Sequence, residues 1–303
     1  MKTYDIIVIG AGPVGLATAM YSGRLGMETL LLGKSIGGTI LLTEKVENYP
    51  GFKSISSAAL IEQFKDHAMD YKDKVKIMER EVIDIGKQEG IFHVRTNKEE
   101  FSCKAVVFTT GAKHKELEVS GSHEFLNKGV HYCALCDGPL YSGKVVAVIG
   151  GGDSAVIEAL TLSKYAKKVY IVNKKAASWA ESRNLDRMSK AKNVEIINNT
   201  NIAGIEGDKF VSRIILDRPY KGKKELALEA VFVAIGYIPI SILAEKLGVE
   251  LNEKRQIKIN RRSETNAPGV YAAGDVTDAE FKQIITGVGE GVAAAFHASK
   301  FVG

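Results

Sequence analysis

The chain has 303 residues, of which 45% are hydrophobic and 25% charged, and its formal net charge is +5. This composition predicts two ordinary globular domains and excludes a fibrous or disordered protein. The basic run at residues 221–224 has no interleaved aromatic side chains, so we expect no nucleic-acid partner. Only three cysteines are present, which excludes a disulfide-stapled secreted scaffold and favours a reducing, cytoplasmic location.

A β-rich run near the N-terminus leads directly into a glycine-rich turn. Residues 4–9 carry no charge after Asp5, which predicts a strand buried on both faces of a parallel sheet. The turn has glycines in the GxGxxG pattern, followed by helical spacing over residues 17–25 and a second expected strand at residues 28–32. Such glycines permit a tight bend, close approach of a pyrophosphate, and packing of the helix on the strand. We therefore predict a dinucleotide site that includes Gly10, Gly12, Pro13 and Gly15.

One residue that usually accompanies this turn is missing. At the end of the second strand, Gly33-Lys34 stands where a carboxylate normally binds the ribose. Recognition of the ribose is therefore expected to differ. Farther along, Cys103 lies in the alternating run at residues 101–108, where we expect a buried strand cysteine without a redox role.

The central feature is the CxxC sequence formed by Cys133 and Cys136, followed by Asp137. A CxxC at the start of a helix lowers the pKa of a thiol, and an adjacent carboxyl group can carry the proton during thiol exchange. Zinc would need two further Cys or His ligands at close spacing, and the chain has no second CxxC. We therefore predict a redox-active dithiol and expect no metal.

A second glycine-rich turn, Gly150-Gly151-Gly152-Asp153-Ser154-Ala155, follows an expected strand at residues 144–149 and opens a helix to about Leu162. It is a GxGxxA variant that leans toward NADP. The next strand, residues 168–172, ends in Asn173-Lys174-Lys175, without the acid that would select NAD. Lys174 and Lys175 are suited to neutralise a 2′-phosphate, so NADPH is favoured over NADH. The alternative is that both lysines only solvate a strand end and that the turn no longer binds a nucleotide.

Two segments of the C-terminal third complete the pattern. Residues 231–244 are apolar but too short to span a bilayer, and Gly236 and Pro239 predict a loop there, so we expect no membrane association. Residues 269–275 predict a strand that ends in Gly274-Asp275. The Asp275 carboxylate is suited to accept hydrogen bonds from a flavin ribityl chain, and the alternative is a simple turn.

Together these motifs resemble the low-molecular-weight thioredoxin reductases over essentially the whole chain. The matching segments are residues 10–15, 37–39, 46–52, 109–112, 133–138, 150–155, 234–237 and 274–284. The resemblance implies an α/β fold of two Rossmann-like dinucleotide-binding domains, the second inserted in the first. Residues 1–113 and 243–303 would form the FAD-binding domain, and residues 114–242 an NAD(P)H-type domain that carries the CxxC.

The resemblance also implies roles for individual residues. Cys136 would lie next to the flavin, Cys133 would attack the partner disulfide, and Asp137 would be the acid-base group. The family would rotate one domain to expose the dithiol, and would form a homodimer. The implied cofactor contacts are Gly10, Gly12, Pro13, Gly15, Gly38, Thr39, Asn48, Thr110, Gly111, Gly274, Asp275, Lys282, Gln283 and Ile284 for FAD, and Gly150, Gly152, Asp153, Ser154, Ala155, Lys174 and Lys175 for NADPH.

Several positions depart from the family. It usually has His-Arg-Arg and a further Arg around the 2′-phosphate, where this chain has Asn173-Lys174-Lys175 and Trp179. Leu135 stands where threonine is usual, and Thr39 where glutamine is usual. The leading hypothesis is an FAD-dependent reductase that passes two electrons from NADPH to thioredoxin or a thioredoxin-like protein. The alternatives are the same reductase fed by ferredoxin, a flavin-dependent dithiol oxidase, and a non-catalytic redox sensor.

Overall fold

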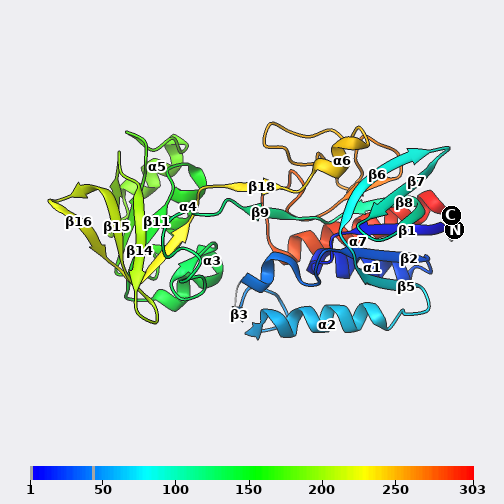
Figure 1. Ribbon diagram of the computed structural model, residues 1–303, viewed down its shortest axis with the longest axis horizontal. Helices are drawn as coiled ribbons and strands as arrows, with labels where there is room; N and C mark the ends of the chain where they lie inside the picture. The colour runs from blue at the N-terminus through cyan, green and yellow to red at the C-terminus, as the bar shows by residue number, and fades with distance from the viewer. Residues whose placement is uncertain (1–2, 43–44) are drawn as a thin grey trace. The chain divides into compact units, whose positions relative to one another are not determined.

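The computed structural model describes residues 3–42 and 45–303, and the chain divides into two compact units. The first unit comprises residues 1–113 and 238–303, and the second comprises residues 114–237. The chain leaves the first unit through strand β9 (Ala112–His114) and returns through strand β18 (Tyr237–Pro239). These two strands pair with each other and form the connection between the units (Figure 1).

A seven-stranded sheet forms the centre of the first unit. Its order is β5–β2–β1–β8–β7–β6, and β19 also pairs with β8. Pairing is parallel from β5 to β8 and between β8 and β19, and antiparallel among β8, β7 and β6. The strands are β1 (Thr3–Ile9), β2 (Thr29–Gly33), β5 (Val75–Glu79), β6 (Val82–Gln88), β7 (Ile91–Thr96), β8 (Glu100–Phe108) and β19 (Val270–Ala272), and a separate short pair is β3 (Lys45–Val46) with β4 (Ile55–Ser56).

The apolar run of β1 is buried on both faces of this sheet. Ile7 packs in one core cluster with Phe108, whereas its neighbour Ile6 packs in a second cluster with Leu31. Because side chains alternate along a strand, both faces must be covered for every residue of the run to be buried. Each such buried side chain contributes about 1.5–3 kcal/mol. The glycine turn after β1 is therefore held by a rigid strand.

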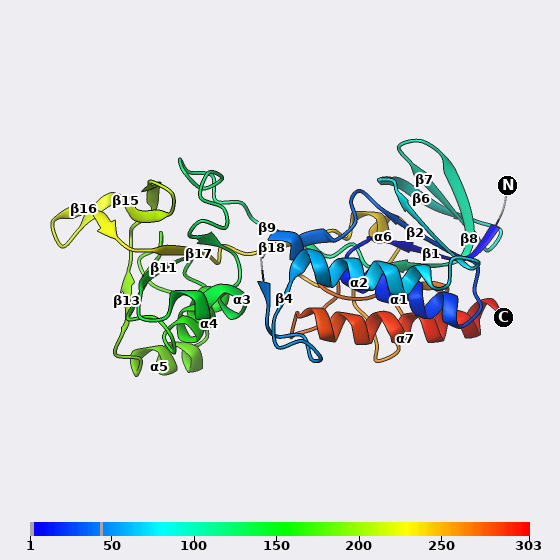
Figure 2. The same cartoon turned by 90° about the horizontal axis from the view of Figure 1, so that it is seen from below.

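Helices cover the sheet of the first unit, and α1 packs between α2 and α7 (Figure 2). The contact between α1 and α7 depends on glycine. A Cβ atom at Gly287 would lie 2.7 Å from the Val14 side chain, and one at Gly291 would lie 2.4 Å from Thr18 Oγ1. The helices are α1 (Pro13–Arg24), α2 (Ser57–Met69), α6 (Ile242–Lys246) and α7 (Ile284–Val302), with the 3₁₀ helix η1 (Gly38–Leu42).

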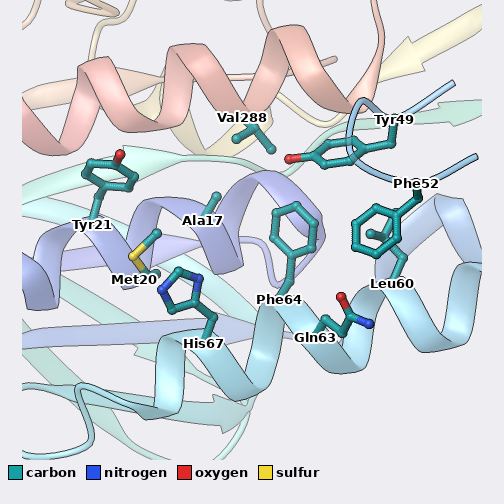
Figure 3. A pocket seen from close by; sticks show the side chains of 10 residues that line it. All are labelled: Ala17, Met20, Tyr21, Tyr49, Phe52, Leu60, Gln63, Phe64, His67 and Val288. Carbon is teal, nitrogen blue, oxygen red and sulfur yellow. The ribbon is translucent and has the colours of Figure 1, made fainter.

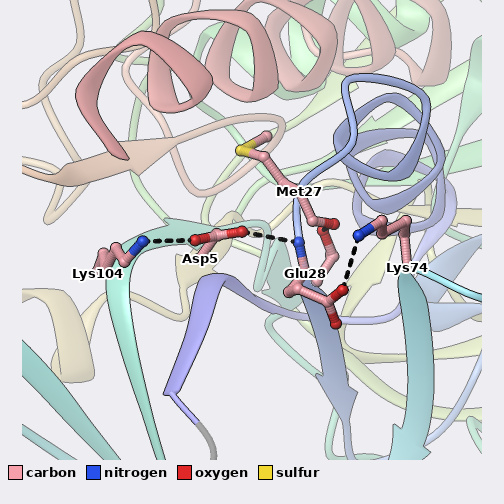
Figure 4. Close-up of polar contacts among 6 residues, drawn as sticks. Asp5, Met27, Glu28, Lys74 and Lys104 are labelled. Carbon is pink, nitrogen blue, oxygen red and sulfur yellow. Dashed lines mark hydrogen bonds and ion pairs between the residues drawn. The ribbon is translucent and has the colours of Figure 1, made fainter. Parts of the chain in front are cut away.

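Charged side chains connect the strands near the amino end of β1 (Figure 4). Lys104 Nζ on β8 lies 2.8 Å from Asp5 Oδ1, and the Glu28 backbone amide donates to Asp5 Oδ2 at 3.0 Å. Lys74 Nζ then lies 2.9 Å from Glu28 Oε1. Burial raises the pKa of Asp5, but the hydrogen bonds from Lys104 and the Glu28 amide outweigh it and leave the pKa lowered. These bonds stabilise the ionised carboxylate.

The second unit contains a five-stranded parallel sheet in the order β10–β17–β11–β12–β13, and an antiparallel sheet in the order β14–β15–β16. The strands are β10 (Val130–His131), β11 (Val145–Ile149), β12 (Lys168–Val172), β13 (Val194–Ile197), β14 (Ile202–Gly207), β15 (Val211–Tyr220), β16 (Lys223–Ala227) and β17 (Ala230–Val233). The helices are α3 (Ala134–Asp137), α4 (Asp153–Leu162) and α5 (Ser182–Ser189), with the 3₁₀ helix η2 (Gly138–Tyr141). The predicted α/β fold with parallel sheets is confirmed.

The prediction of a loop for residues 231–244 was wrong. Val231–Val233 pairs with β11 inside the parallel sheet, and β18 and α6 account for much of the remainder. A buried central strand needs only a short unbroken apolar run, which ends here at Val233; Gly236 lies in the break before β18, and Pro239 is the last residue of β18. Within the described ranges, no helix is long and apolar enough to cross a membrane.

Candidate active site

Cys133 and Cys136 form a disulfide at the start of α3, with 5.3 Å between their Cα atoms. Cys133 is the N-cap of this short helix, and the Cys136 backbone amide donates to Cys133 Sγ at 3.1 Å. Both cysteines are half-buried, and Leu135 between them is 45% exposed. A hydrogen bond to sulfur favours its charged form, so the amide would stabilise a Cys133 thiolate after reduction.

Asp137 lies directly behind the dithiol in a buried polar cluster. Its Oδ2 is 3.2 Å from His131 Nδ1, and His131 Nε2 lies 2.7 Å from the Tyr141 hydroxyl. The His131 ring also stacks on Phe232, with 5.4 Å between ring centroids. Asp137 and His131 are 6% and 5% exposed, so their orientation is fixed by packing. His131 was not predicted from the sequence, because nothing in its spacing shows that β10 and α3 bring it to Asp137.

The first glycine turn is crowded at Gly10 and Gly15 and open at Gly12. A Cβ atom at Gly10 would lie 2.3 Å from the Thr109 carbonyl oxygen, and one at Gly15 would lie 1.8 Å from the Gly10 carbonyl oxygen. At Gly12 the nearest atom would be the Gly37 carbonyl oxygen, 3.7 Å away. Pro13 then occupies the first turn of α1. An open position at a helix N-terminus is suited to a phosphate group.

The surroundings of this turn explain the missing carboxylate. A Cβ atom at Gly33 would lie 2.6 Å from Ala11 Cβ and 2.8 Å from Ala11 N, so the position has no room for a side chain. The Gly37 amide donates to the Ala11 carbonyl oxygen at 2.8 Å and holds η1 against the turn. Gly38 and Thr39, at the start of η1, are exposed.

Residues around the N-terminus of α7 form a second part of the first unit's site. Gln283 is the N-cap of α7, which begins at Ile284, and its Oε1 accepts from Asn48 Nδ2 at 2.9 Å. Lys282 Nζ donates to the backbone carbonyl oxygen of Asp275 at 3.0 Å. Residues far apart in the sequence therefore meet where α7 begins.

The carboxyl group of Asp275 is largely buried. Among the residues that the structure describes, none donates a hydrogen bond to it. Burial raises its pKa, although the Lys282 ammonium acts in the opposite direction. The preceding amide, Gly274 N, donates to Glu290 Oε2 at 2.7 Å. Sequence reasoning missed Glu290, which comes from the second turn of α7 and fixes this bend. A buried carboxyl group without a protein partner is suited to accept hydroxyl groups of a bound molecule.

Thr110 and Gly111 lie where the chain leaves the first unit. Thr110 Oγ1 donates to the Ile240 carbonyl oxygen at 2.6 Å, and the Ile240 amide donates to the Gly111 carbonyl oxygen at 3.0 Å. These two residues thus join the outgoing and returning chain segments. With the open turn at Gly12 and the buried carboxyl group of Asp275, the first unit has donors and acceptors that fit FAD.

The second glycine turn repeats the construction of the first. Gly150 N donates to the Val172 carbonyl oxygen at 3.1 Å, as Gly10 N does to that of Leu32 at 2.7 Å. A Cβ atom at Gly150 would lie 2.4 Å from the Ala234 carbonyl oxygen. Ala155 is fully buried in the first turn of α4, where the first unit has Gly15. The backbone of a dinucleotide turn is therefore present in both units.

The space above the second turn differs, because the side chain of Trp179 lies on it. A Cβ atom at Gly152 would lie 2.8 Å from Trp179 Nε1, and one at Gly151 would lie 2.7 Å from Trp179 Cζ3. Lys175 Nζ lies 4.2 Å from the centroid of the tryptophan ring, and both Lys174 and Lys175 are exposed. The second turn is therefore more crowded than the first at the glycine that matches Gly12.

The other side chains predicted at the second turn are partly engaged in hydrogen bonds within the protein. Asp153 Oδ1 accepts from the Glu181 amide at 2.8 Å and from Asn184 Nδ2 at 3.0 Å. Ser154 is exposed on the first turn of α4. Asn173 is fully buried, and its Oδ1 accepts from the Lys175 amide at 3.0 Å. This strand end is thus held by its own side chains.

Features outside these sites are simpler. Cys103 is fully buried in β8, and burial raises its pKa, so it remains a thiol. No group of three or more His, Cys, Asp or Glu among the described residues could hold a metal ion. A cavity of about 300 Å³ lies along α1, α2 and α7, lined by aromatic side chains that include Tyr49 and Phe64 (Figure 3). Neither the dithiol nor a residue of the glycine turns lines it.

The chain is similar to known proteins over nearly its whole length. Residues 4–291 match the family described as pyridine nucleotide-disulphide oxidoreductase. Thioredoxin reductase of Treponema pallidum (strain Nichols) is 35% identical over 302 residues, covering 99% of this chain and 97% of its own. A 34.2 kDa protein in the rubredoxin operon of Clostridium pasteurianum is 38% identical over 305 residues, covering 100% and 98%. Thioredoxin reductase from Streptococcus pyogenes MGAS5005 has a TM-score of 0.91 at 30% identity, covering 99% and 98%.

Proposed function

This chain belongs to the pyridine nucleotide-disulphide oxidoreductase family, and on that premise we propose that it passes two electrons from NADPH to a protein disulfide. It is an FAD-dependent oxidoreductase of the thioredoxin reductase type. The proposed final acceptor is thioredoxin or a thioredoxin-like protein. The observation that carries the proposal is the Cys133–Cys136 disulfide, whose neighbour Asp137 is buried against His131.

We propose that the first unit holds FAD, and that the second provides the nucleotide turn and the dithiol. Bound in the first unit, FAD would supply the two-electron chemistry that links a nicotinamide hydride to a disulfide. Gly12 leaves room for the pyrophosphate at the N-terminus of α1, and Asp275 accepts hydroxyl hydrogen bonds. The remaining contacts proposed in the first unit are Gly10, Pro13, Gly15, Gly38, Thr39, Asn48, Thr110, Gly111, Gly274, Lys282, Gln283 and Ile284.

The reduced cysteines then perform thiol exchange. The Cys133 thiolate attacks one sulfur of the partner disulfide, which breaks that bond and forms a mixed disulfide. The Cys136 thiolate next attacks Cys133 Sγ, which restores the Cys133–Cys136 disulfide and releases the partner as a dithiol. Asp137 supplies and accepts the proton at Cys136, and His131 positions the Asp137 carboxyl group. Two electrons and two protons leave with the partner.

The second unit carries both the dithiol and the nucleotide turn, and both must reach the same flavin. They cannot occupy one flavin face at the same time, so we propose that the second unit rotates on β9 and β18 between the two half-reactions. By likeness to thioredoxin reductases we also propose a homodimer that works in the cytoplasm.

A second candidate differs only in the electron donor. Trp179 lies on the second glycine turn, and no arginine stands in the Asn173-Lys174-Lys175 run. These observations favour a small electron-carrying protein such as ferredoxin, which would need no pyrophosphate site. The net charge of +5 suits an acidic protein of this kind.

An anaerobic titration of the FAD-loaded protein separates the candidates. NADPH, NADH and a photoreduced ferredoxin are added in turn, and flavin absorbance is followed. We expect near-stoichiometric NADPH to bleach the flavin absorbance. Bleaching by ferredoxin alone would show that ferredoxin, and not NADPH, is the electron donor. In the Cys133→Ser variant, the flavin should be reduced by the same donor, but the variant should fail to reduce thioredoxin. Release of peroxide with a small dithiol as substrate would instead indicate an oxidase.

A further inference from the structure

We infer that Trp179 is a plug of the second glycine turn, which must leave that turn before any pyridine nucleotide can bind. The inference rests on the proposed role of this turn as the nicotinamide nucleotide site. It adds a residue of this chain that controls access to that site.

The two glycine turns of the chain provide an internal comparison. Both have the same closed underside, formed by a carbonyl oxygen of the neighbouring strand's end: Thr109 O beneath Gly10 and Ala234 O beneath Gly150. Above Gly12, a Cβ atom would meet no atom closer than 3.7 Å, whereas above Gly152 it would meet the indole nitrogen at 2.8 Å. A phosphate oxygen must approach the backbone amides of such a turn within hydrogen-bond distance, and at the second turn the ring lies against the glycine that matches Gly12.

The plug is held by the chain segment around it. The Trp179 amide and Ser178 Oγ both donate to the Gly151 carbonyl oxygen, at 3.0 and 2.7 Å. Two residues farther on, the Glu181 amide donates to Asp153 Oδ1 at 2.8 Å. Hydrogen bonds therefore fasten this segment to the turn on both sides of the tryptophan.

The ring is nevertheless only partly covered by the protein. The Trp179 side chain is 51% exposed, so one part lies on the glycines and the rest faces solvent. Lys175, one of the two lysines proposed to bind the 2′-phosphate, lies over the ring. Opening the plug would release both the glycine turn and Lys175. A single side chain thus couples the two parts of the nucleotide site.

Binding of NADP⁺ and of NAD⁺ to the oxidised, FAD-loaded protein tests the inference by calorimetry. Trp179→Ala should bind both nucleotides at least tenfold more tightly than wild type, because the pyrophosphate is common to both. Phe210→Ala, which removes a 65% exposed aromatic side chain of the same unit, should bind both like wild type. FAD content and melting temperature identify any misfolded variant, and Trp179→Ser then serves as the second substitution.

Other outcomes overturn the inference. Unchanged or weaker nucleotide binding by Trp179→Ala would mean that the ring does not obstruct the turn. Tighter binding of NADP⁺ alone would mean that the ring acts on the 2′-phosphate and not on the pyrophosphate. Trp179 is the only tryptophan of the chain, so its emission should change when wild type binds NADP⁺. If only Trp179→Ala binds NADP⁺, then NADPH is not the natural donor, but the obstruction of the turn by Trp179 is supported. If wild type already binds tightly and the variant equally so, the plug fails while NADPH stands.

Discussion

Glu158 on α4 has a carboxyl oxygen that is buried without a hydrogen-bond partner among the described residues. Burial raises its pKa to about 8, because the ionised form loses its hydration. The folded protein therefore keeps this proton up to about pH 8, whereas the unfolded chain releases it near its ordinary pKa of 4.5. The unfolded state binds fewer protons between these values, so the contribution of Glu158 to stability falls as pH rises.

Glu158→Gln keeps the shape of the side chain and removes this titration. We expect the variant to gain stability over wild type progressively between pH 4.5 and pH 8, by on the order of 4–5 kcal/mol at the upper end. Melting temperatures of both proteins, measured across this range with FAD bound, check the prediction. Curves that run parallel would show that the carboxyl group is hydrated in the folded protein.

At the scale of single residues, the sequence predicted motif positions but not their long-range contacts. The glycine turns that contain Gly12 and Gly152 were predicted from the spacing of the glycines alone. Whether the space above each was open could not be known, because it depends on Gly37 in one case and Trp179 in the other. The contact of His131 with Asp137 was likewise hidden, since it depends on how α3 packs beside β10.

At the scale of elements, the proposed FAD site depends on the close approach of α1 and α7. Gly287 in α7 lies against Val14 in the first turn of α1 and against Gly274, with 3.0 Å from its added Cβ to Gly274 Cα. This contact places the bend before Asp275 next to the N-terminus of α1, where the open turn at Gly12 lies. The absence of a side chain at Gly287 is therefore a requirement of the site.

Gly287→Ala should force the two helices apart and destabilise the protein by about 1–3 kcal/mol, with loss of bound FAD. The control is Gly289→Ala in the same helix, where an added Cβ meets nothing within 4 Å. That change should be neutral or stabilising by up to about 1 kcal/mol, because alanine favours helix more than glycine does. Melting temperature and the ratio of flavin to protein absorbance measure both effects. Equal behaviour of the two variants would contradict the packing argument.

Elements with strong patterns were predicted closely, and the weaker ones were not. The strand at residues 168–172 and the end of the helix at Leu162 agree with β12 and α4, because an apolar run and a helical period are properties of local sequence. The loop prediction for residues 231–244 failed since its glycine and proline were given more weight than the apolar residues before them. Pairing of β17 with β11 decides that segment, and pairing is not a local property.

At the scale of the whole molecule, two glycines flank the connections between the units. Gly111 and Gly236 have φ angles of +68° and +108°, a region that residues with a side chain rarely adopt. Gly236 also accepts a hydrogen bond from the Lys115 amide at 2.9 Å, just beyond β9. A proposed rotation on β9 and β18 would depend on the backbone freedom at these positions.

Gly236→Ala should therefore slow thioredoxin reduction at least fivefold while leaving FAD content unchanged. Gly222→Ala is the matched control, since Gly222 has a φ of +81° in the turn between β15 and β16, outside the connections. Both changes should destabilise the protein by about 1–3 kcal/mol through backbone strain. Steady-state turnover and melting temperature separate strain from motion. Full turnover by Gly236→Ala at a lowered melting temperature would argue against rotation on these strands.

The crowding at Gly33 has a consequence for protein engineering. A designer who wished to change how the adenosine half of a dinucleotide is read would first graft an acid onto the end of β2, as in other folds of this kind. Here the graft would collide with Ala11 and deform the turn that it was meant to serve. Lys34, whose exposed side chain is paired only loosely with Glu81 at 3.3 Å, is the nearer position open to redesign.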